Sequence, residues 1–139
     1  MPNIRYQRLA NERLPLANKF YKSQRSPMRV GRSEQVWVAQ QAEIIAACCL
    51  KPVADGHWLS ALLVAREQRQ QGVASQLLNT LRGHSQGPIW LFCAPQLLGF
   101  YQRLGFAPCP DLPGELNERL LRYQRKQPLL ALAAAPQCG

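Results

Sequence analysis

The feature that most constrains the fold is a change of hydrophobic period in the middle of this 139-residue chain. Residues 44–50 and 58–64 are nearly continuous apolar runs, which are typical of buried strands. Apolar residues then recur at helical spacing, at Val73, Ala74, Leu77, Leu78 and Leu81, before residues 89–94 return to a continuous run. A strand–helix–strand unit of this kind has parallel strands and a right-handed crossover, so the chain is predicted to combine helices with a sheet.

The flanking segments predict further elements on both sides of this unit. Residues 40–43 read as a hairpin that makes strand 44–50 antiparallel to its predecessor, so the sheet is mixed. Gly83 is expected to cap the central helix, and Gly105 is expected just after the next one. The other expected elements are a strand around residues 4–6, a helix from 15 to 25, a strand at 36–39, a helix around 97–104, a helix at 115–125 and a strand at 129–134.

Composition limits the class of protein. With 47% hydrophobic and 18% charged residues, the chain is predicted to fold as one domain over residues 1–139. Residues 1–6 lack the apolar core of a secretory signal, and no apolar run is long enough to cross a membrane. The net charge of +9 favours anionic partners, such as nucleic acid, a membrane surface or a phosphorylated small molecule.

The cysteines indicate a reducing compartment. The chain has five, an odd number, and no two stand as C-x-x-C. Cys48, Cys49 and Cys93 lie in the apolar runs and are interpreted as buried, reduced thiols. A zinc or other metal site is therefore not expected, and the predicted location is the cytoplasm.

A polar segment links the apolar run 58–64 to the helix that begins after Gly72. The start of a helix leaves its first N–H groups without partners and carries partial positive charge. Gly72 and Ala74 have almost no side chain, so an anion can approach the backbone closely. The segment is neither a P-loop nor a dinucleotide fingerprint, because it lacks their Lys and additional glycines. Taken alone it also fits an ordinary helix start, with Arg69 as a surface charge.

A second motif supports a functional interpretation of the segment before the central helix. Residues 98–106 read L-G-F-Y-Q-R-L-G-F, and residues 100–106 resemble the F-Y-x-x-x-G-F segment of the GNAT acetyltransferase superfamily. Residues 69–74, R-Q-Q-G-V-A, resemble the family's Q/R-x-x-G-x-G/A motif, which binds the pyrophosphate of acyl-CoA. The two motifs stand roughly 30 residues apart across one strand, as a strand–helix–strand–helix unit requires. From about Trp58 to Phe106 the chain therefore resembles a small, single-domain GNAT member.

The resemblance implies a fold and a cofactor site. The fold is an α/β (α+β) structure, a mixed, centrally splayed sheet of about six to seven strands with helices on both faces. Acetyl-CoA, the acyl donor, is expected in the gap between strands 58–64 and 89–94. Backbone groups of Leu62 and Val64 would pair with the pantetheine arm, and N–H groups of residues 70–75 would hold the pyrophosphate. The implied cofactor-binding residues are Leu62, Leu63, Val64, Arg69, Gln70, Gln71, Gly72, Val73, Ala74 and Ser75.

The resemblance also implies a mechanism, in which an amine attacks the thioester directly. A backbone N–H, with Leu63 as the candidate, would stabilise the oxyanion, and Tyr101 would protonate the departing thiolate. Tyr101 equally fits a half-buried aromatic on a helix face. Many members place a Glu near the start of the splayed strand, where this chain has His57, so His57, Glu43 and a water chain stay open as the base. Residues 93–96 lack the Asn that often contacts the cofactor in the family.

The acceptor side is marked by charge. Residues 1–33 carry one acid, Glu12, and eight basic side chains: Arg5, Arg8, Arg13, Lys19, Lys22, Arg25, Arg29 and Arg32. They form either a solvated face or a surface that favours an acidic acceptor, whereas polycationic acceptors are disfavoured.

The sequence thus predicts an acetyl-CoA-dependent N-acetyltransferase acting on a primary amine of an unidentified small-molecule or protein acceptor, as a monomer or homodimer. The alternative is a non-catalytic acyl-CoA-binding regulatory module. A nucleic-acid binder is not expected, because no helix-turn-helix, zinc finger or aromatic platform is present.

Overall fold

The structure is a computed structural model and describes residues 3–134. Its main elements are β1 (Arg5–Arg8), α1 (Leu14–Ser23), β2 (Gln35–Gln40), β3 (Ile44–Val53), β4 (Gly56–Val64), α2 (Val73–His84), β5 (Ile89–Cys93), α3 (Leu98–Arg103), β6 (Ala107–Pro108), α4 (Gly114–Gln124) and β7 (Leu130–Ala134). Short 3-10 turns precede α1, α2 and α3. None of the helices within the described range is long and apolar enough to cross a membrane.

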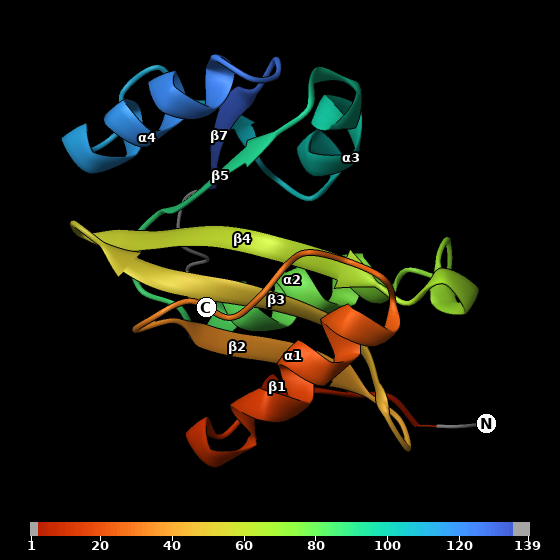
Figure 1. The fold of residues 1–139 in the computed structure, drawn as a ribbon. Helices are drawn as coiled ribbons and strands as arrows, with labels where there is room; N and C mark the ends of the chain where they lie inside the picture. Colours follow the sequence, from red (N-terminus) through yellow and green to blue (C-terminus); the bar gives the residue numbers. More distant parts are fainter. Residues whose placement is uncertain (1–2, 135–139) are drawn as a thin grey trace.

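The strands form one mixed sheet of seven strands in the order β1-β2-β3-β4-β5-β7-β6. Among its pairs, β4 and β5 are parallel, and α2 is the crossover that joins them. Figure 1 shows α1 in front of the sheet and α2 behind it. The predicted mixed sheet with helices on both faces is therefore confirmed.

Strand alternation places α4 on the same face of the sheet as α1. Trp58 packs with Leu116 of α4, and Ser60, two residues further along β4, shares the Trp58 face. Ser60 is paired with Cys49 of β3, whose thiol contacts Tyr21 of α1. The buried residues of α1 and α2 nevertheless belong to one main core, whereas Leu116 of α4 packs in a smaller cluster with Val53, Trp58 and Trp90.

The parallel pair β4–β5 is closed at one end only. Its register consists of His57 opposite Ile89 and Trp58 opposite Trp90, although β4 continues to Val64. A Cβ at Gly56 would lie 2.1 Å from the carbonyl oxygen of Pro88, so the two strands meet there more closely than any larger residue allows. Beyond Trp58 the strands diverge (Figure 1), which confirms the predicted central splay.

A β-bulge in the β3–β4 pairing lies just beyond the point where β4 separates from β5. The β3–β4 register passes from Cys49–Ser60 to Ala47–Leu63, so β4 carries one extra residue at this point. Within it, Ala61 has a φ of +56°, in the left-handed region. A bulge bends its strand and increases the local twist, and this gives a physical cause for the divergence of β4 from β5.

Two details differ from the sequence prediction. Gly83 does not cap α2, which continues to His84, because the Ser85 hydroxyl donates a 2.7 Å hydrogen bond to the Leu81 carbonyl and closes the helix end. The two-residue strand β6 was not predicted, since Pro108 is unfavourable in a strand except at a sheet edge, where β6 lies. Gly105 follows α3 with a φ of +93°, as expected.

The predicted burial of three cysteines is confirmed. Cys48, Cys49 and Cys93 are buried in strands and make no disulfide. Cys138 lies outside the described residues. Within residues 3–134, no group of three His, Cys, Asp or Glu side chains lies close enough to hold a metal ion.

The eight basic side chains of residues 1–33 are all exposed.

Candidate active site

A cavity of about 540 Å³ opens where β4 and β5 diverge. Its walls come from the end of β4, the loop and first turn of α2, and the start of α3. The lining residues are Leu62, Leu63, Val64, Gln68, Arg69, Gln70, Gly72, Val73, Ala74, Ser75, Leu97, Phe100 and Tyr101. The structure thus brings Tyr101 together with the proposed cofactor residues, except Gln71, whose amide points back to the Glu67 carbonyl at 3.4 Å.

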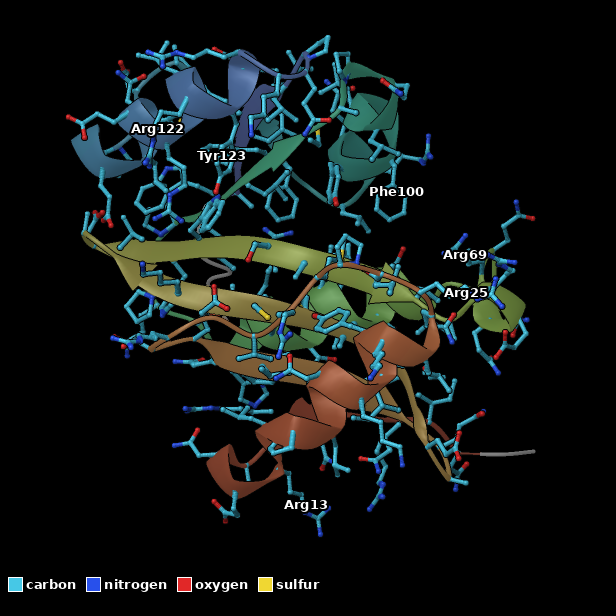
Figure 2. The ribbon with its side chains drawn as sticks, in the orientation of Figure 1. Arg13, Arg25, Arg69, Phe100, Arg122 and Tyr123 are labelled. Carbon is cyan, nitrogen blue, oxygen red and sulfur yellow. The ribbon has the colours of Figure 1, made fainter. Side chains whose placement is uncertain are left out.

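Three lining residues were missed at the sequence level. Leu97 and Phe100 belong to the helix face that the F-Y motif marked, and that periodicity was the signal available. Figure 2 shows Phe100 pointing from α3 toward β4. Gln68 closes the 3-10 turn Arg66–Gln68 between β4 and α2, and no pattern in the sequence indicated that turn.

The N-terminus of α2 is uncapped and faces this cavity. Gly72 stands at the N-cap with a φ of +79°, which glycine adopts without strain, and no side chain caps the helix. The first helical hydrogen bond runs from the Gln76 N–H to the Gly72 carbonyl, at 3.0 Å. The N–H groups of residues 73–75 therefore have no acceptor in the helix. Apart from Gly72 and its chain neighbours, no atom of the described residues lies within 4 Å of where a Gly72 Cβ would stand. This arrangement suits an anion.

Arg69 fixes the loop before this helix to the end of β4. Its Nε donates a 3.2 Å hydrogen bond to the Val64 carbonyl, while its side chain stays exposed beside the cavity. Arg25 lies at the same end of the molecule (Figure 2), in a polar hollow that it shares with Arg66 and Glu67. The local charge is therefore predominantly positive next to the uncapped helix end.

Tyr101 is a buried phenol in the cavity wall. Its side chain is 9% exposed, and its ring lies between Phe100 and Phe106 with centroid distances of 5.0 and 5.9 Å. Burial raises the pKa of Tyr101 to about 12, with a smaller contribution from the thiols of Cys93 and Cys48. The hydroxyl is therefore protonated at neutral pH, and no group within residues 3–134 makes a hydrogen bond with it.

Successive backbone N–H and C=O groups of β4 point alternately toward β3 and toward the cavity. The Ala65 N–H donates a 2.7 Å hydrogen bond to Ile45 of β3. Because backbone groups of a strand alternate in direction, the Leu63 N–H also points toward β3, where Leu63 is opposite Ala47. Val64 and Leu62 therefore present their backbone groups to the opposite edge, on the side of the open gap, where the Val64 carbonyl accepts the hydrogen bond from Arg69.

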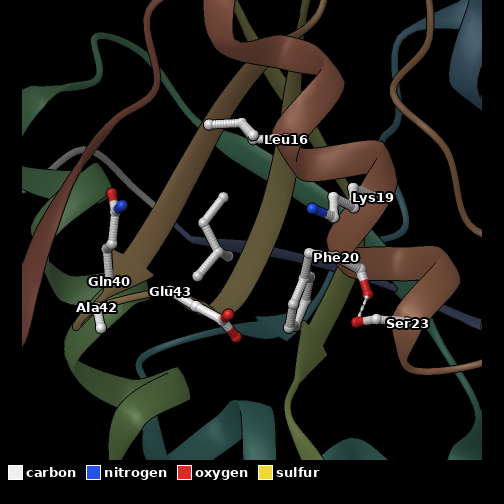
Figure 3. A pocket seen from close by; sticks show the side chains of 8 residues that line it. Leu16, Lys19, Phe20, Ser23, Gln40, Ala42 and Glu43 are labelled. Carbon is white, nitrogen blue, oxygen red and sulfur yellow. Dashed lines mark hydrogen bonds between the residues drawn. The ribbon is translucent and has the colours of Figure 1, made fainter.

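The candidate bases from the sequence do not join this cavity. His57 lies at the closed end, paired with Ile89, and Leu62 is five positions further along the strand, roughly 17 Å away. Glu43 lines a separate cavity of about 210 Å³ between α1 and the β2–β3 hairpin, together with Lys19 (Figure 3). Gln96, which was not a candidate base and ends the segment 93–96 that lacks the family's Asn, is exposed and is not among the residues that line the cavity.

Comparisons with known proteins agree with this geometry. Residues 32–108, more than half of the chain, match the family model described as an acetyltransferase (GNAT) domain. The crystal structure of Tetrahymena GCN5 is similar with a TM-score of 0.71 at 13% identity, covering 96% of this chain and 96% of that chain. A GNAT-family acetyltransferase from Staphylococcus aureus Mu50 gives a TM-score of 0.65 at 13% identity, covering 97% of this chain and 100% of that chain.

A third similar structure was determined with coenzyme A bound. N-acetylglutamate synthase from Neisseria gonorrhoeae, complexed with coenzyme A and L-arginine, gives a TM-score of 0.71 at 11% identity and covers 99% of this chain and 34% of that chain. No curated protein matches by sequence. At these identities the structures show the fold, whereas the family model shows the family. The uncapped helix, the splayed strands and the family match lead to one conclusion: the chain belongs to the GNAT acetyltransferase family and is an acyltransferase.

Proposed function

We propose that this chain transfers an acetyl group from acetyl-CoA to an amine by direct attack on the thioester. The observation that carries the proposal is that one cavity joins an uncapped helix N-terminus, the free edge of β4 and a buried, protonated phenol. The helix N-terminus can bind a diphosphate, and the edge of β4 can pair with the amide groups of the pantetheine arm. The phenol can protonate the departing thiolate.

In this proposal acetyl-CoA lies along β4 with its diphosphate at α2. The N–H groups of residues 73–75, with Gln70 and Arg69 beside them, hold the phosphate oxygens by charge-assisted hydrogen bonds. The pantetheine arm adds to β4 like an extra strand through the backbone of Leu62 and Val64. The thioester then lies deeper in the gap, within reach of Tyr101.

The reaction is a single acyl transfer. The amine nitrogen forms a bond to the thioester carbon, a backbone N–H of β4 stabilises the resulting oxyanion, and the C–S bond breaks as the carbonyl reforms. Tyr101 gives its proton to the departing sulfur and regains one from solvent. Burial raises the pKa of Tyr101, and it also raises the pKa of the nearby buried Cys93 thiol, which lies outside the cavity. Burial of the coenzyme A thiol in the gap should raise its pKa in the same direction, which limits the pKa mismatch between the Tyr101 hydroxyl and the departing thiolate.

The amine must lose a proton, and the cavity supplies no side chain for that step. None of the residues within 3–134 that line the cavity is Asp, Glu or His. Water, or an amine that arrives neutral, takes this role in the proposed mechanism. The same observation favours the alternative function, a regulatory module that binds acyl-CoA without turnover.

Two measurements test the proposal. Calorimetric titration with acetyl-CoA should show binding at one site per chain, and thiol release with a panel of primary amines should identify at least one acceptor. Binding without release for any amine would favour the regulatory module. Failure to bind acetyl-CoA would contradict both functions.

A further inference from the structure

A buried tyrosine of α1 contacts the bulge of β4. The Tyr21 side chain has no exposed surface, and its hydroxyl donates a 2.7 Å hydrogen bond to the carbonyl oxygen of Ala61. The same hydroxyl lies 3.8 Å from the sulfur of Cys49 on β3. Tyr21 thus reaches over β3 to the point where β4 begins to line the cavity, at Leu62.

This contact fixes the direction of one peptide group. Ala61 has a φ of +56°, a conformation that a residue with a Cβ keeps only where its surroundings hold it. Because a trans peptide is planar, the carbonyl of Ala61 and the N–H of Leu62 point in opposite directions. The carbonyl points at Tyr21, and the Leu62 N–H therefore points away from it.

Leu62 is well placed to donate that N–H to a ligand. The β3–β4 register passes from Ser60 to Leu63, so Leu62 has no partner residue in β3, and it lines the cavity. The Leu63 N–H, in contrast, points toward β3. Strand alternation and the bulge therefore favour Leu62 over Leu63 as the donor to the thioester.

We propose that Tyr21 is a positioning residue for acyl transfer: its hydrogen bond to Ala61 holds the Leu62 N–H toward the thioester carbonyl. The inference rests on the proposed function, because it requires acetyl-CoA in the gap. Tyr21 touches neither donor nor acceptor and acts through one peptide. The Leu62 N–H polarises the thioester carbonyl before attack and stabilises the oxyanion afterwards.

The test combines the Tyr21→Phe variant with acetyl-CoA labelled with ¹³C at the carbonyl. In the parent protein, infrared difference spectra should show the bound carbonyl stretch shifted to lower frequency than in free acetyl-CoA. In Tyr21→Phe the shift should be smaller, and kcat should fall roughly 10- to 100-fold with an acetyl-CoA KM within about 3-fold of the parent. Tyr6→Phe, on β1 and outside the cavity, is the control and should match the parent.

The outcomes separate the two proposals. If the parent binds acetyl-CoA and Tyr21→Phe shows the same carbonyl shift and the same kcat, the positioning role is wrong and the proposed function stands. If the parent does not bind acetyl-CoA, the proposed function fails and this inference with it. Should Tyr21→Phe not fold, the parent still provides a test: the Leu62 amide proton should move downfield with acetyl-CoA relative to CoA, and equal shifts would overturn the inference.

Discussion

The two ends of the β4–β5 pair are built in opposite ways. At the closed end the strands are hydrogen-bonded, Trp58 and Trp90 are at most 8% exposed, and a Cβ at Gly56 would overlap the Pro88 carbonyl. At the open end the strands have separated, the lining residues of β4 are half-buried, and the N–H groups at the start of α2 have no helical partner. At the closed end the backbone of β4 is hydrogen-bonded within the chain, whereas the open end leaves backbone groups unpaired.

The difference shows how one pair of strands divides two tasks. Unpaired backbone groups cost stability, so they persist where a ligand can satisfy them. The closed end also holds Arg119 of α4, whose guanidinium lies 4.5 Å from the Trp58 ring, and Tyr123, which points from α4 toward β5 (Figure 2). Mutations at the closed end should therefore change stability, and mutations at the open end should change binding and turnover.

The largest expected effect is at the helix N-terminus. Gly72→Glu places a carboxylate where the diphosphate is expected, and losing two charge-assisted hydrogen bonds should weaken acetyl-CoA binding by about 1000-fold, roughly 4 kcal/mol. Gly83→Glu makes the same charge change at the other end of α2, where a Cβ would meet no atom within 4 Å. Calorimetry should find that variant close to the parent, and equal affinities for both variants would refute the placement of the diphosphate.

The next effect concerns turnover at the open end. Tyr101→Phe removes only the hydroxyl, and losing a general acid should lower kcat by about 100-fold. Acetyl-CoA affinity and thermal stability should change little, because that hydroxyl has no hydrogen bond within residues 3–134. Thiol release with an amine identified in the panel measures the change, and Tyr123→Phe on α4 serves as the matched control. Full turnover in Tyr101→Phe would exclude the acid role.

The third effect is at the closed end and should leave binding intact. In Gly56→Ala the new Cβ meets backbone rather than a movable side chain, so the free energy of unfolding should fall by about 2–3 kcal/mol. Urea denaturation measures this loss, and calorimetry on the folded variant should give nearly the parent affinity. A variant that keeps its stability but loses acetyl-CoA would reverse the assignment of the two ends.

The smallest effect is an alkaline loss of stability from the paired strands. Burial raises the pKa of Cys49 from about 9 to about 12, so between these values unfolding releases a proton and higher pH favours the unfolded chain. Cys49 alone should leave stability nearly constant below about pH 8 and lower it by about 1.4 kcal/mol at pH 10, and burial of Cys48, which also raises its pKa, adds to this loss. Cys49→Ala should reduce this slope and Cys109→Ala, at a half-exposed site, should not. Equal slopes in all three proteins would contradict the assignment.

The sequence predicted the parts of the site that depend on local pattern. The apolar run before Gly72 and the helical spacing after it located the uncapped helix, and the F-Y motif located Tyr101. The resemblance to a family supplied the splay between the strands, which no periodicity encodes.

The parts that were missed depend on distant contacts. In the sequence Ala61 resembles an ordinary strand residue. Its left-handed backbone depends on a contact with Tyr21, which is 40 residues away in sequence and donates a hydrogen bond to the Ala61 carbonyl. The position of His57 at the closed end likewise follows from pairing with β5 rather than from neighbouring residues. Local pattern therefore predicted most of the residues that line the cavity, while the sheet register determined which backbone groups face it.

The most direct test of this account is a crystal structure of the protein with acetyl-CoA. The diphosphate should lie within hydrogen-bond distance of the N–H groups of residues 73–75, with the pantetheine arm beside Leu62 and Val64. Acetyl-CoA bound elsewhere, with the end of α2 empty, would contradict the claim that the open end of the β4–β5 pair is the acyl-donor site.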